Sequence, residues 1–438
     1  MMKKLNNRGK LMKKLNKKIF LASMIGNALE FYDFTIYGFF VAIISPVFFP
    51  ATDPLTSLIS GFGVFAIGFF TRPLGAIFFG HIGDRFGRRK ALSLTIIWMA
   101  IPTVIIGLLP TYQQIGIAAP ILLTFCRVIQ GFSAGGEYNG AGVFVIEHSP
   151  ENKRGFLGAL LTASGSMGAL LASGIGMLFT LPFMPSWGWR VPFFLGGLIA
   201  VVGLYVRKQI DESPEFKQVY LQKKSHSLPV FSVLKENKIS FLCTIGIGAM
   251  ATVPFYIILA YMNPMLLTKG KVIASTMMLI NALMSMICII SLPLMGYLSD
   301  KIGKSKVMIF AAILMILFAY PFFWVFENGS LTSIILFQAF MMILTEAYTG
   351  PSNAFMYKLF DTSKRYTGVA LGYTLGLAIF GGTTPYISAN LIKYFGSPYT
   401  PAFYLIGIGV LGLISVIGGR MRTHKISNIG GVLLSSQN

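Results

Sequence analysis

The sequence has few of the residues that build metal centres, disulfides and soluble surfaces. Its 438 residues include 3 Cys and 4 His, and 12% are charged, whereas a soluble domain carries about 25% charge. Cys126, Cys243 and Cys288 fall in separate apolar stretches without C-x-x-C spacing, which indicates buried free thiols and predicts no metal site. The absence of a G-x-x-x-x-G-K-[ST] phosphate loop argues against ATP-driven pumping. We therefore expect no cofactor and exclude an ordinary soluble enzyme.

Long apolar runs are abundant, and 54% of the residues are hydrophobic. A helical run of about 20 residues spans the roughly 30 Å hydrocarbon core of a bilayer. Runs of this length alternate with short charged stretches, which predicts an all-α membrane protein whose partner is the lipid bilayer. The twelve predicted spans are residues 19–45, 57–80, 91–109, 118–147, 157–180, 190–207, 240–267, 273–298, 306–326, 331–359, 367–391 and 401–419.

Basic residues outnumber acidic ones by 36 to 15, and the formal net charge is +21. With twelve spans, the termini and the loops on their side hold 30 of the Lys and Arg residues, and the opposite side holds 4. The positive-inside rule then predicts cytoplasmic termini in a bacterial inner membrane. The cations are dispersed over loops without a soluble fold to display them, so we expect no nucleic-acid partner.

A repeated loop divides the chain into two halves. The pattern Gly, Asp, cation, Gly at residues 80–87 recurs at residues 296–303, at an offset of 216 residues. Duplicated halves with a substrate site between them are typical of secondary transporters, so we expect two pseudo-symmetric six-helix bundles. The predicted divisions are a basic cytoplasmic tail at 1–18, an N-terminal bundle at 19–207, a cytoplasmic linker at 208–238, a C-terminal bundle at 239–420 and a cytoplasmic tail at 421–438.

Several segments resemble one known family. They are the G-x-x-G-D-R-x-G-R-R loop at 80–89, its copy at 296–306, and residues 29–34, 72–75, 127–137 and 189–216. The two loops resemble the major facilitator superfamily, and the other segments resemble its metabolite:proton symporter branch, which includes proline/betaine, 2-oxoglutarate, shikimate and citrate porters. The resemblance implies twelve helices, the major facilitator fold and proton-driven symport. The copy departs from the pattern with Lys301 and Lys304, and Phe31 stands where the branch has Trp.

Acidic residues inside the predicted spans are candidates for proton coupling. A charge at this depth costs about 3 kcal/mol unless it faces a cavity or a partner. Glu30 and Asp33 share one face of the first helix, and their repulsion favours a proton on at least one of them near neutral pH. All four histidines lie outside the spans, so carboxylates must carry any proton. We predict coupling by Glu30, Asp33 and Glu137, and a structural ion pair with an arginine is the alternative.

Arg127 and Arg72 are the arginines inside the predicted spans. The planar guanidinium of Arg127 suits a carboxylate and cannot lose its charge. We predict that Arg127 binds the substrate carboxylate and that Gln130, Tyr37 and Arg72 also bind the substrate. The alternatives are an ion pair of Arg127 with one of the predicted coupling carboxylates, and a packing contact of Arg72 with the first helix.

Glu346 and Asn353 share one face of the tenth predicted helix, and Pro351 is expected to break its hydrogen-bond ladder beside them. Interrupted helices often border transport sites, so we predict that both side chains bind the substrate, with a proton role as the alternative for Glu346. The other polar residues in these spans, which we interpret as ordinary interhelical hydrogen-bonding groups, are Asn263, Asn281 and Ser285.

The repeated loop is predicted to gate transport. Its charged residues lie at helix ends, where ion pairs and helix dipoles latch two halves together. A solvated surface loop is the alternative. The predicted gating residues are Gly80, Asp84, Arg85, Gly87, Arg88, Arg89 and Asp300.

These observations predict a monomeric, proton-coupled symporter that imports a small zwitterionic or carboxylated metabolite, such as proline or betaine, by alternating access. Its partners would be the substrate, H⁺ and the bilayer. An organic-acid symporter of the 2-oxoglutarate, citrate or shikimate type is the alternative. A channel or a non-transporting membrane protein would not need the duplicated loop. A membrane-embedded enzyme would need a cluster of nucleophile, histidine or metal ligands, which the sequence lacks.

Overall fold

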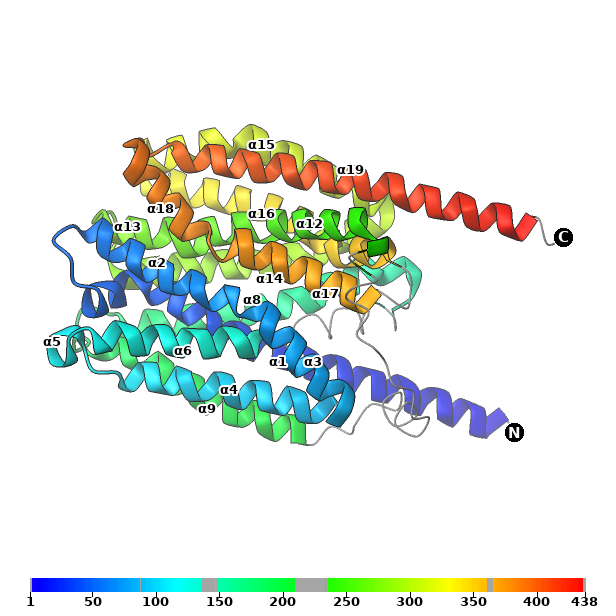
Figure 1. Ribbon diagram of the computed structural model, residues 1–438, viewed down its shortest axis with the longest axis horizontal. Helices are drawn as coiled ribbons and strands as arrows, with labels where there is room; N and C mark the ends of the chain where they lie inside the picture. The colour runs from blue at the N-terminus through cyan, green and yellow to red at the C-terminus, as the bar shows by residue number, and fades with distance from the viewer. Residues whose placement is uncertain are drawn as a thin grey trace.

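The computed structural model describes residues 2–86, 88–135, 146, 149–208, 233, 235–360 and 365–435, and in residues 2–19, 21–23, 80–81, 83–86, 88–92, 206–208, 366 and 423–435 it describes the backbone alone. The secondary structure of these residues is entirely helical. Figure 1 shows the helices running side by side along the long axis, with α1 (Met2–Phe48) and α19 (Thr400–Ser435) extending beyond the bundle at the same end. Both described ends of the chain therefore lie on one side of the bundle.

The N-terminal half contains six crossing segments, of which the second is divided. Its two helices meet at Thr71 because Pro73 has no N–H group to continue the hydrogen-bond ladder through this turn. The described elements after α1 are α2 (Pro54–Phe70), α3 (Arg72–Phe86), α4 (Arg88–Leu108), α5 (Tyr112–Ile115), α6 (Ala118–Ala134), η1 (Glu151–Lys153), α8 (Arg154–Phe179), η2 (Gly188–Arg190) and α9 (Val191–Lys208).

The C-terminal half contains six more crossing segments, of which two are divided by π-helical turns. Such turns insert an extra residue into a helix and are frequent at functional sites. The elements before α19 are α12 (Lys238–Tyr256), η3 (Ile257–Met262), α13 (Asn263–Thr268), α14 (Ala274–Ile302), α15 (Lys304–Asn328), α16 (Leu331–Met356), η4 (Tyr357–Leu359), α17 (Arg365–Gly376), η5 (Leu377–Gly381) and α18 (Thr384–Phe395).

The prediction of twelve crossing segments in two bundles is confirmed. Nine stretches of the described residues are long and apolar enough to cross a membrane alone, and Ser93–Leu108 and Ala118–Ala134 are shorter apolar helices. The remaining crossing consists of α17 and α18, which are separated by the π-helical turn η5. One expectation was wrong, because α16 continues through Pro351. A proline removes one hydrogen bond, and in this helix the loss does not end the ladder. The interruptions lie in η3 and η5 instead.

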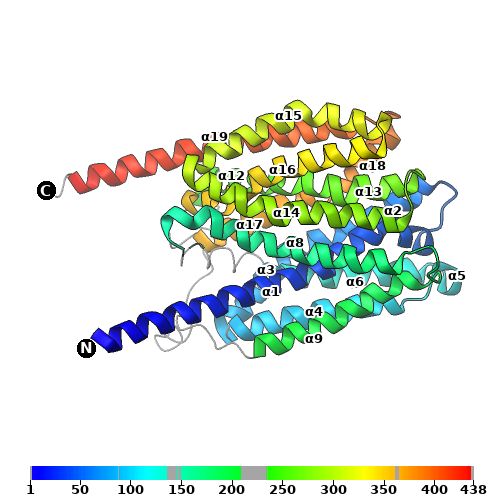
Figure 2. The same cartoon turned by 180° about the vertical axis from the view of Figure 1, so that it is seen from behind.

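The two halves meet most extensively along α8 and α14, which lie side by side in both views (Figure 2). Further contacts between the halves join α2 to α18 and α1 to α13. The helices α1, α2, α8, α13, α14, α16 and α18 therefore lie along the boundary between the halves.

Candidate functional site

Arg127 of α6 is completely buried. Its Nη1 donates a 2.8 Å hydrogen bond to Oε1 of Gln130, one turn along the same helix. Its Cζ lies 4.4 Å from the ring centroid of Tyr37 and 4.6 Å from that of Phe34, both on α1. Nε and Nη2 have no hydrogen-bond partner among the described residues. The guanidinium therefore has unused donors in the fork arrangement that binds a carboxylate.

Phe34 also contacts a second buried arginine. Arg72, the first residue of α3, has its Cζ 4.1 Å from the ring centroid of Phe34 and 4.7 Å from that of Phe69. Its Nε likewise has no hydrogen-bond partner among the described residues. Cation–π contacts hold a guanidinium in place without neutralising it. Two positive charges therefore share one aromatic ring, which favours an anionic ligand beside them.

Close packing of α2 and α3 against α6 places these two arginines. A Cβ atom on Gly131 of α6 would collide with the carbonyl oxygen of Gly68 of α2, so a glycine permits this approach. At the break between α2 and α3, the Thr71 hydroxyl lies 3.0 Å from the carbonyl oxygens of Gly68 and Val128. The same break starts α3 at Arg72 and so brings its side chain toward α1.

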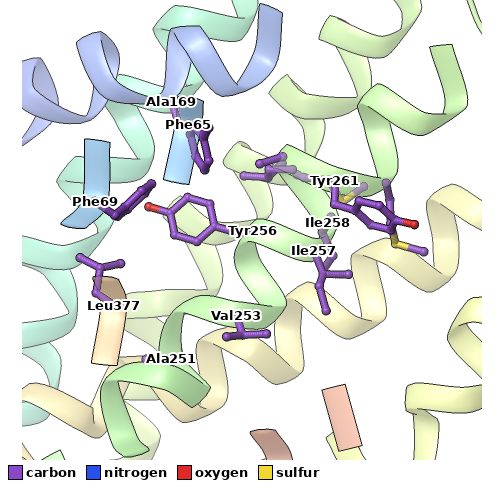
Figure 3. Close-up of a cluster of buried hydrophobic side chains, with 14 of the residues drawn as sticks. Phe65, Phe69, Ala169, Ala251, Val253, Tyr256, Ile257, Ile258, Tyr261 and Leu377 are labelled. Atoms are coloured by element: carbon purple, nitrogen blue, oxygen red, sulfur yellow. The ribbon is translucent and has the colours of Figure 1, made fainter. Parts of the chain in front are cut away.

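Tyr256, at the end of α12, brings the C-terminal half into this group. Its ring centroid lies 5.7 Å from that of Phe65 and 5.3 Å from that of Phe69, with edge-on geometry in both pairs. Figure 3 shows Tyr256 beside both of these rings, with its hydroxyl toward Phe69. Phe65 also stacks with Tyr37, at 6.3 Å between centroids. We call this set the arginine–aromatic cluster, and its members are Phe34, Tyr37, Phe65, Phe69, Arg72, Arg127 and Tyr256.

Asp33 is buried at 5% exposure and lies against α9. Its Oδ1 has no hydrogen-bond partner among the described residues and would lie 2.7 Å from a Cβ atom on Gly196. Thr103 of α4 packs on the same glycine and accepts a 2.7 Å hydrogen bond from Nε2 of Gln130. Among the described residues, Asp33 and Arg127 do not form an ion pair. Asp33 and Arg127 are therefore not paired, and the contacts of Gln130 with Thr103 and of Thr103 with Gly196 connect their surroundings.

The other predicted carboxylates are differently placed. Glu30 is buried at 3% exposure in α1, whereas Glu137 lies outside the described residues. Glu346 of α16 is buried at 2% exposure, and its carboxyl lies within hydrogen-bonding reach of the Cys288 thiol of α14. The same thiol reaches the hydroxyl of Ser166 in α8, across the boundary between the halves. Glu346 therefore belongs to the α8–α14–α16 contact and not to the arginine–aromatic cluster.

Asn353 belongs to the same contact, because its Nδ2 donates a 3.1 Å hydrogen bond to the hydroxyl of Thr162 in α8. The six predicted substrate-binding residues thus fall into two groups. The first group, which the structure brings together around Phe34, is Arg72, Arg127, Gln130 and Tyr37. The second group, on α16, is Glu346 and Asn353.

Asp300 is the predicted gating residue with a described side chain. Its two carboxylate oxygens each lie 2.9 Å from a backbone nitrogen at the start of α8, those of Gly155 and Phe156. Lys304 donates a further 2.8 Å hydrogen bond to the same carboxylate. A negative charge at a helix N-terminus is stabilised by the helix dipole. For Gly80, Asp84, Arg85, Arg88 and Arg89 only the backbone is described, and Gly87 lies outside the described residues.

Sequence reasoning did not predict four members of the cluster as site residues, which are Tyr256 and the three phenylalanines Phe34, Phe65 and Phe69. The available signal was spacing, because Phe69 lies one turn before Arg72 and Phe34 one turn before Tyr37. The chain has 38 Phe, and the sequence does not distinguish these three from the Phe residues that face lipid or fill the core.

The two halves each match a family model. The family described as "Sugar (and other) transporter" matches residues 18–238, and the family described as "Major Facilitator Superfamily" matches residues 255–425. The chain belongs to the major facilitator superfamily. The resemblance inferred from the repeated loop is thereby confirmed.

Within the superfamily, this member is similar to bacterial proteins named as betaine and proline transporters. It is 35% identical over 416 residues to the glycine betaine/proline/ectoine/pipecolic acid transporter of Dickeya dadantii, covering 91% of this chain and 82% of that protein. It is 35% identical over 429 residues to the proline/betaine transporter of Salmonella typhimurium, covering 94% and 85%. The proline/betaine transporter of Escherichia coli is 34% identical over 418 residues, covering 92% and 83%.

Solved structures share the fold of this superfamily member. A D-xylose–proton symporter superposes with a TM-score of 0.71 at 19% identity, covering 92% of this chain and 96% of that chain. A proton:xylose symporter bound to 6-bromo-6-deoxy-D-glucose gives a TM-score of 0.73 at 16% identity, covering 92% and 95%. At this identity the likeness shows the fold alone. The chain is a multi-span membrane protein of a transporter family, and its partner is a small-molecule substrate.

Proposed function

We propose that this chain is a proton-coupled symporter that imports small zwitterions bearing a carboxylate, such as proline and betaine, and that it is not an enzyme. The observation that carries the proposal is the pair of buried guanidiniums, Arg72 and Arg127, which lie over aromatic rings and keep N–H donors that have no partner among the described residues. A guanidinium stays charged at physiological pH, so a carboxylate from the substrate completes its hydrogen bonds. The names of the relatives, proline/betaine transporters, support the same substrate class.

The arginine–aromatic cluster orients the proposed zwitterion. The rings of Phe34 and Tyr37 already carry guanidiniums, so a third cation placed on them is repelled by two like charges. The substrate carboxylate therefore binds at the arginines, and its ammonium group lies away from them, toward the C-terminal half. Tyr256 closes the cluster from that half, so binding of the substrate brings the two halves together.

Asp33 is the proposed proton carrier, with Glu30 and Glu137 in the same role. An ionised carboxylate in a membrane-spanning helix is costly without a partner, and a bound proton removes that cost. The unpartnered Oδ1 of Asp33 supports this role. Protonation removes the negative charge of the Asp33 carboxylate. The N-terminal half can then reorient with the substrate bound.

We propose that transport proceeds by alternating access, in which the two halves open the site to one side of the membrane at a time. Asp300 latches α14 to α8 at the side where the chain ends, and the first repeated loop, at residues 80–90, is proposed to do the same with the opposite pair of helices. The basic loops on that side support cytoplasmic termini in the bacterial inner membrane. The complete pair of bundles in one chain supports a monomer as the working unit.

Transport by the purified protein in proteoliposomes tests the proposal. With an inward proton gradient, vesicles should accumulate radiolabelled proline or glycine betaine, and Asp33→Asn should abolish accumulation while counterflow exchange continues. Asp53→Asn is the matched control, because Asp53 is an exposed carboxylate that caps α2 outside the membrane. Uphill uptake by Asp33→Asn at the wild-type rate would show that Asp33 does not carry the proton.

An organic-acid symporter is the second candidate. The two guanidiniums beside Phe34 favour it, since a dicarboxylate would pair with both. Competition separates the candidates in the same vesicles. Inhibition by 2-oxoglutarate or citrate with no inhibition by proline or glycine betaine would establish the organic-acid symporter.

A further inference from the structure

A carboxyl, a thiol and a hydroxyl form a buried polar group that the proposed function does not use. The Glu346 carboxyl of α16 lies within hydrogen-bonding reach of the Cys288 thiol of α14, which reaches the Ser166 hydroxyl of α8. The three residues are 2%, 0% and 5% exposed, respectively. Because α8 belongs to the N-terminal half and α14 and α16 to the C-terminal half, this group joins the two halves. We call it the carboxyl–thiol junction.

The junction lies near the middle of all three helices. Each of its residues is about ten or more residues from both ends of its helix, which corresponds to about 15 Å or more along the axis. This distance is about half the thickness of the hydrocarbon core of a bilayer. Ion sites of secondary transporters often lie at this depth, between the two repeats. The junction therefore has the position of an ion site.

The described residues place no cation beside the Glu346 carboxyl. The titratable group that acts on it is the Cys288 thiol, and the described ion pairs do not include Glu346. Tyr348 points to α19, where its hydroxyl donates a 3.0 Å bond to the Gly412 carbonyl. The charged residues of the described helices packed along α16 all lie in a first or last turn, and they are Arg154 on α8, Lys238 on α12, Asp300 and Lys301 on α14, and Lys304, Lys306 and Glu327 on α15.

These surroundings suit a protonated carboxyl. Asp300 lies nearly at the end of α14, about 18 Å along the axis from Cys288. An ionised carboxylate at this depth costs about 3 kcal/mol without a cation, whereas a protonated one avoids this cost and its O–H group donates a hydrogen bond. A glutamine would make similar contacts without titrating. Packing alone therefore does not explain why an acid occupies this position.

We infer that Glu346 is a second proton-binding site, separate from Asp33, and that its proton is required for α14 and α16 to close on α8. The inference rests on the proposed function, because the contact that it controls is part of the alternating-access cycle. Ionisation of Glu346 places an uncompensated charge between the halves and slows their reorientation. The proton at Glu346 stays with the junction, whereas accumulation of substrate is driven through Asp33.

Counterflow at equal pH on both sides of proteoliposomes tests this inference on the full-length chain. The Asp33→Asn background removes the titration of the proposed coupling carboxylate. Exchange of radiolabelled proline or glycine betaine is measured in this background, alone and combined with Glu346→Gln or Glu346→Met, from about pH 5 to about pH 9, the range in which buried carboxyls titrate. With Glu346 present, the rate should fall at least about tenfold toward high pH, as expected when one proton is required. With either substitution, the rate should stay within about twofold, because neither side chain titrates.

Thr162→Val in the same background is the matched control. Thr162 lies one turn before Ser166 on α8, and its hydroxyl accepts the 3.1 Å bond from Asn353 across the boundary. The substitution removes a polar contact between the halves but no titratable group, so the rate should change by the same factor at every pH. A fall toward high pH that persists in both Glu346 variants would overturn the inference. A rate that is independent of pH while Glu346 is present would also overturn it.

Thermal unfolding provides a measurement that does not depend on transport. A folded chain that keeps a proton on Glu346 loses stability as the pH rises, because the unfolded carboxyl ionises above about pH 4.3. The Tm of wild type should therefore fall relative to that of Glu346→Gln as the pH rises. A constant difference in Tm would overturn the inference. A chain that exchanges neither compound would overturn the proposed function, and the melting curves would then decide whether Glu346 holds a proton.

Discussion

The backbone of Gly155 in α8 touches that of Gly296 in α14, where the two halves meet. A Cβ atom on Gly296 would lie 2.5 Å from the carbonyl oxygen of Gly155 and 2.6 Å from Cβ of Ala159. Both distances are too short for an alanine, and a backbone neighbour has no rotamer with which to move aside. Small residues of this kind let membrane helices approach closely.

Gly296→Ala should therefore force α8 and α14 apart. We expect a loss of about 1 to 3 kcal/mol of stability, seen as a lower Tm, together with slower uptake in proteoliposomes. Gly174→Ala, on the same α8, is the control, because nothing lies within 4 Å of the added Cβ. Its Tm should rise slightly, since alanine is favoured over glycine in a helix by about 1 kcal/mol. An equal fall in Tm for both variants would contradict the proposed close contact.

Asp300→Asn should weaken the latch on α8, because it removes the negative charge from the helix N-terminus and from Lys304. We expect the rate of counterflow to fall about tenfold, which corresponds to about 1.4 kcal/mol. Lys301→Met is the control, since the Lys301 ammonium lies over the Tyr297 ring at 4.6 Å and the ion pair described for Asp300 is with Lys304. Wild-type rates for Asp300→Asn would remove Asp300 from the gating mechanism.

Arg127→Lys should raise the KM for the transported zwitterion at least tenfold. Lysine keeps the charge but loses the planar fork that stacks on Tyr37 and Phe34 and that pairs with a carboxylate. The measurement is initial uptake against substrate concentration. Arg190→Lys is the comparison, because Arg190 bonds the carbonyls of Gly107 and Leu109, at 2.8 and 2.7 Å, near the end of α4. This variant should lower Tm and leave KM unchanged. A KM for Arg127→Lys that matches wild type would exclude a carboxylate-binding role.

Asp53 should make the stability of the chain depend on pH. Hydrogen bonds from the Thr56 hydroxyl and from the Leu55 and Thr56 N–H groups hold the pKa of Asp53 below its usual value. A carboxyl with a lowered folded pKa stabilises the protein above its unfolded pKa of about 3.9, and this contribution is lost as the pH falls through the folded value.

The test compares thermal unfolding of Asp53→Ala with wild type from pH 7 to pH 3. The variant should melt about 1 to 2 °C lower at pH 7, and the difference should shrink below about pH 4. Asp53→Asn keeps a capping side chain but cannot titrate, so its difference from wild type should also be smaller at low pH. A difference that grows on acidification would contradict this assignment.

Much of the fold could be predicted from the sequence because a bilayer imposes strong rules. Run length predicts spans, and the distribution of Lys and Arg predicts which loops share a side. Helix continuity was harder to predict. Pro351 is accommodated inside α16, whereas the interruptions lie at residues 257–262 and 377–381, where packing decides whether an extra residue fits into the helix.

The sequence by itself determined the class of protein, because its charge distribution, repeated loop and apolar runs admit twelve helices in two halves. It also made Arg127, Gln130 and Tyr37 candidates for substrate binding, since they are polar residues within apolar spans. Only the tertiary structure decided that Phe34 contacts Arg72 as well as Arg127, and that among the described residues Asp33 forms no ion pair with either arginine. It likewise brought Glu346 together with Cys288 and Ser166. These relationships depend on how closely helices from distant parts of the chain approach, which periodicity within one helix does not encode.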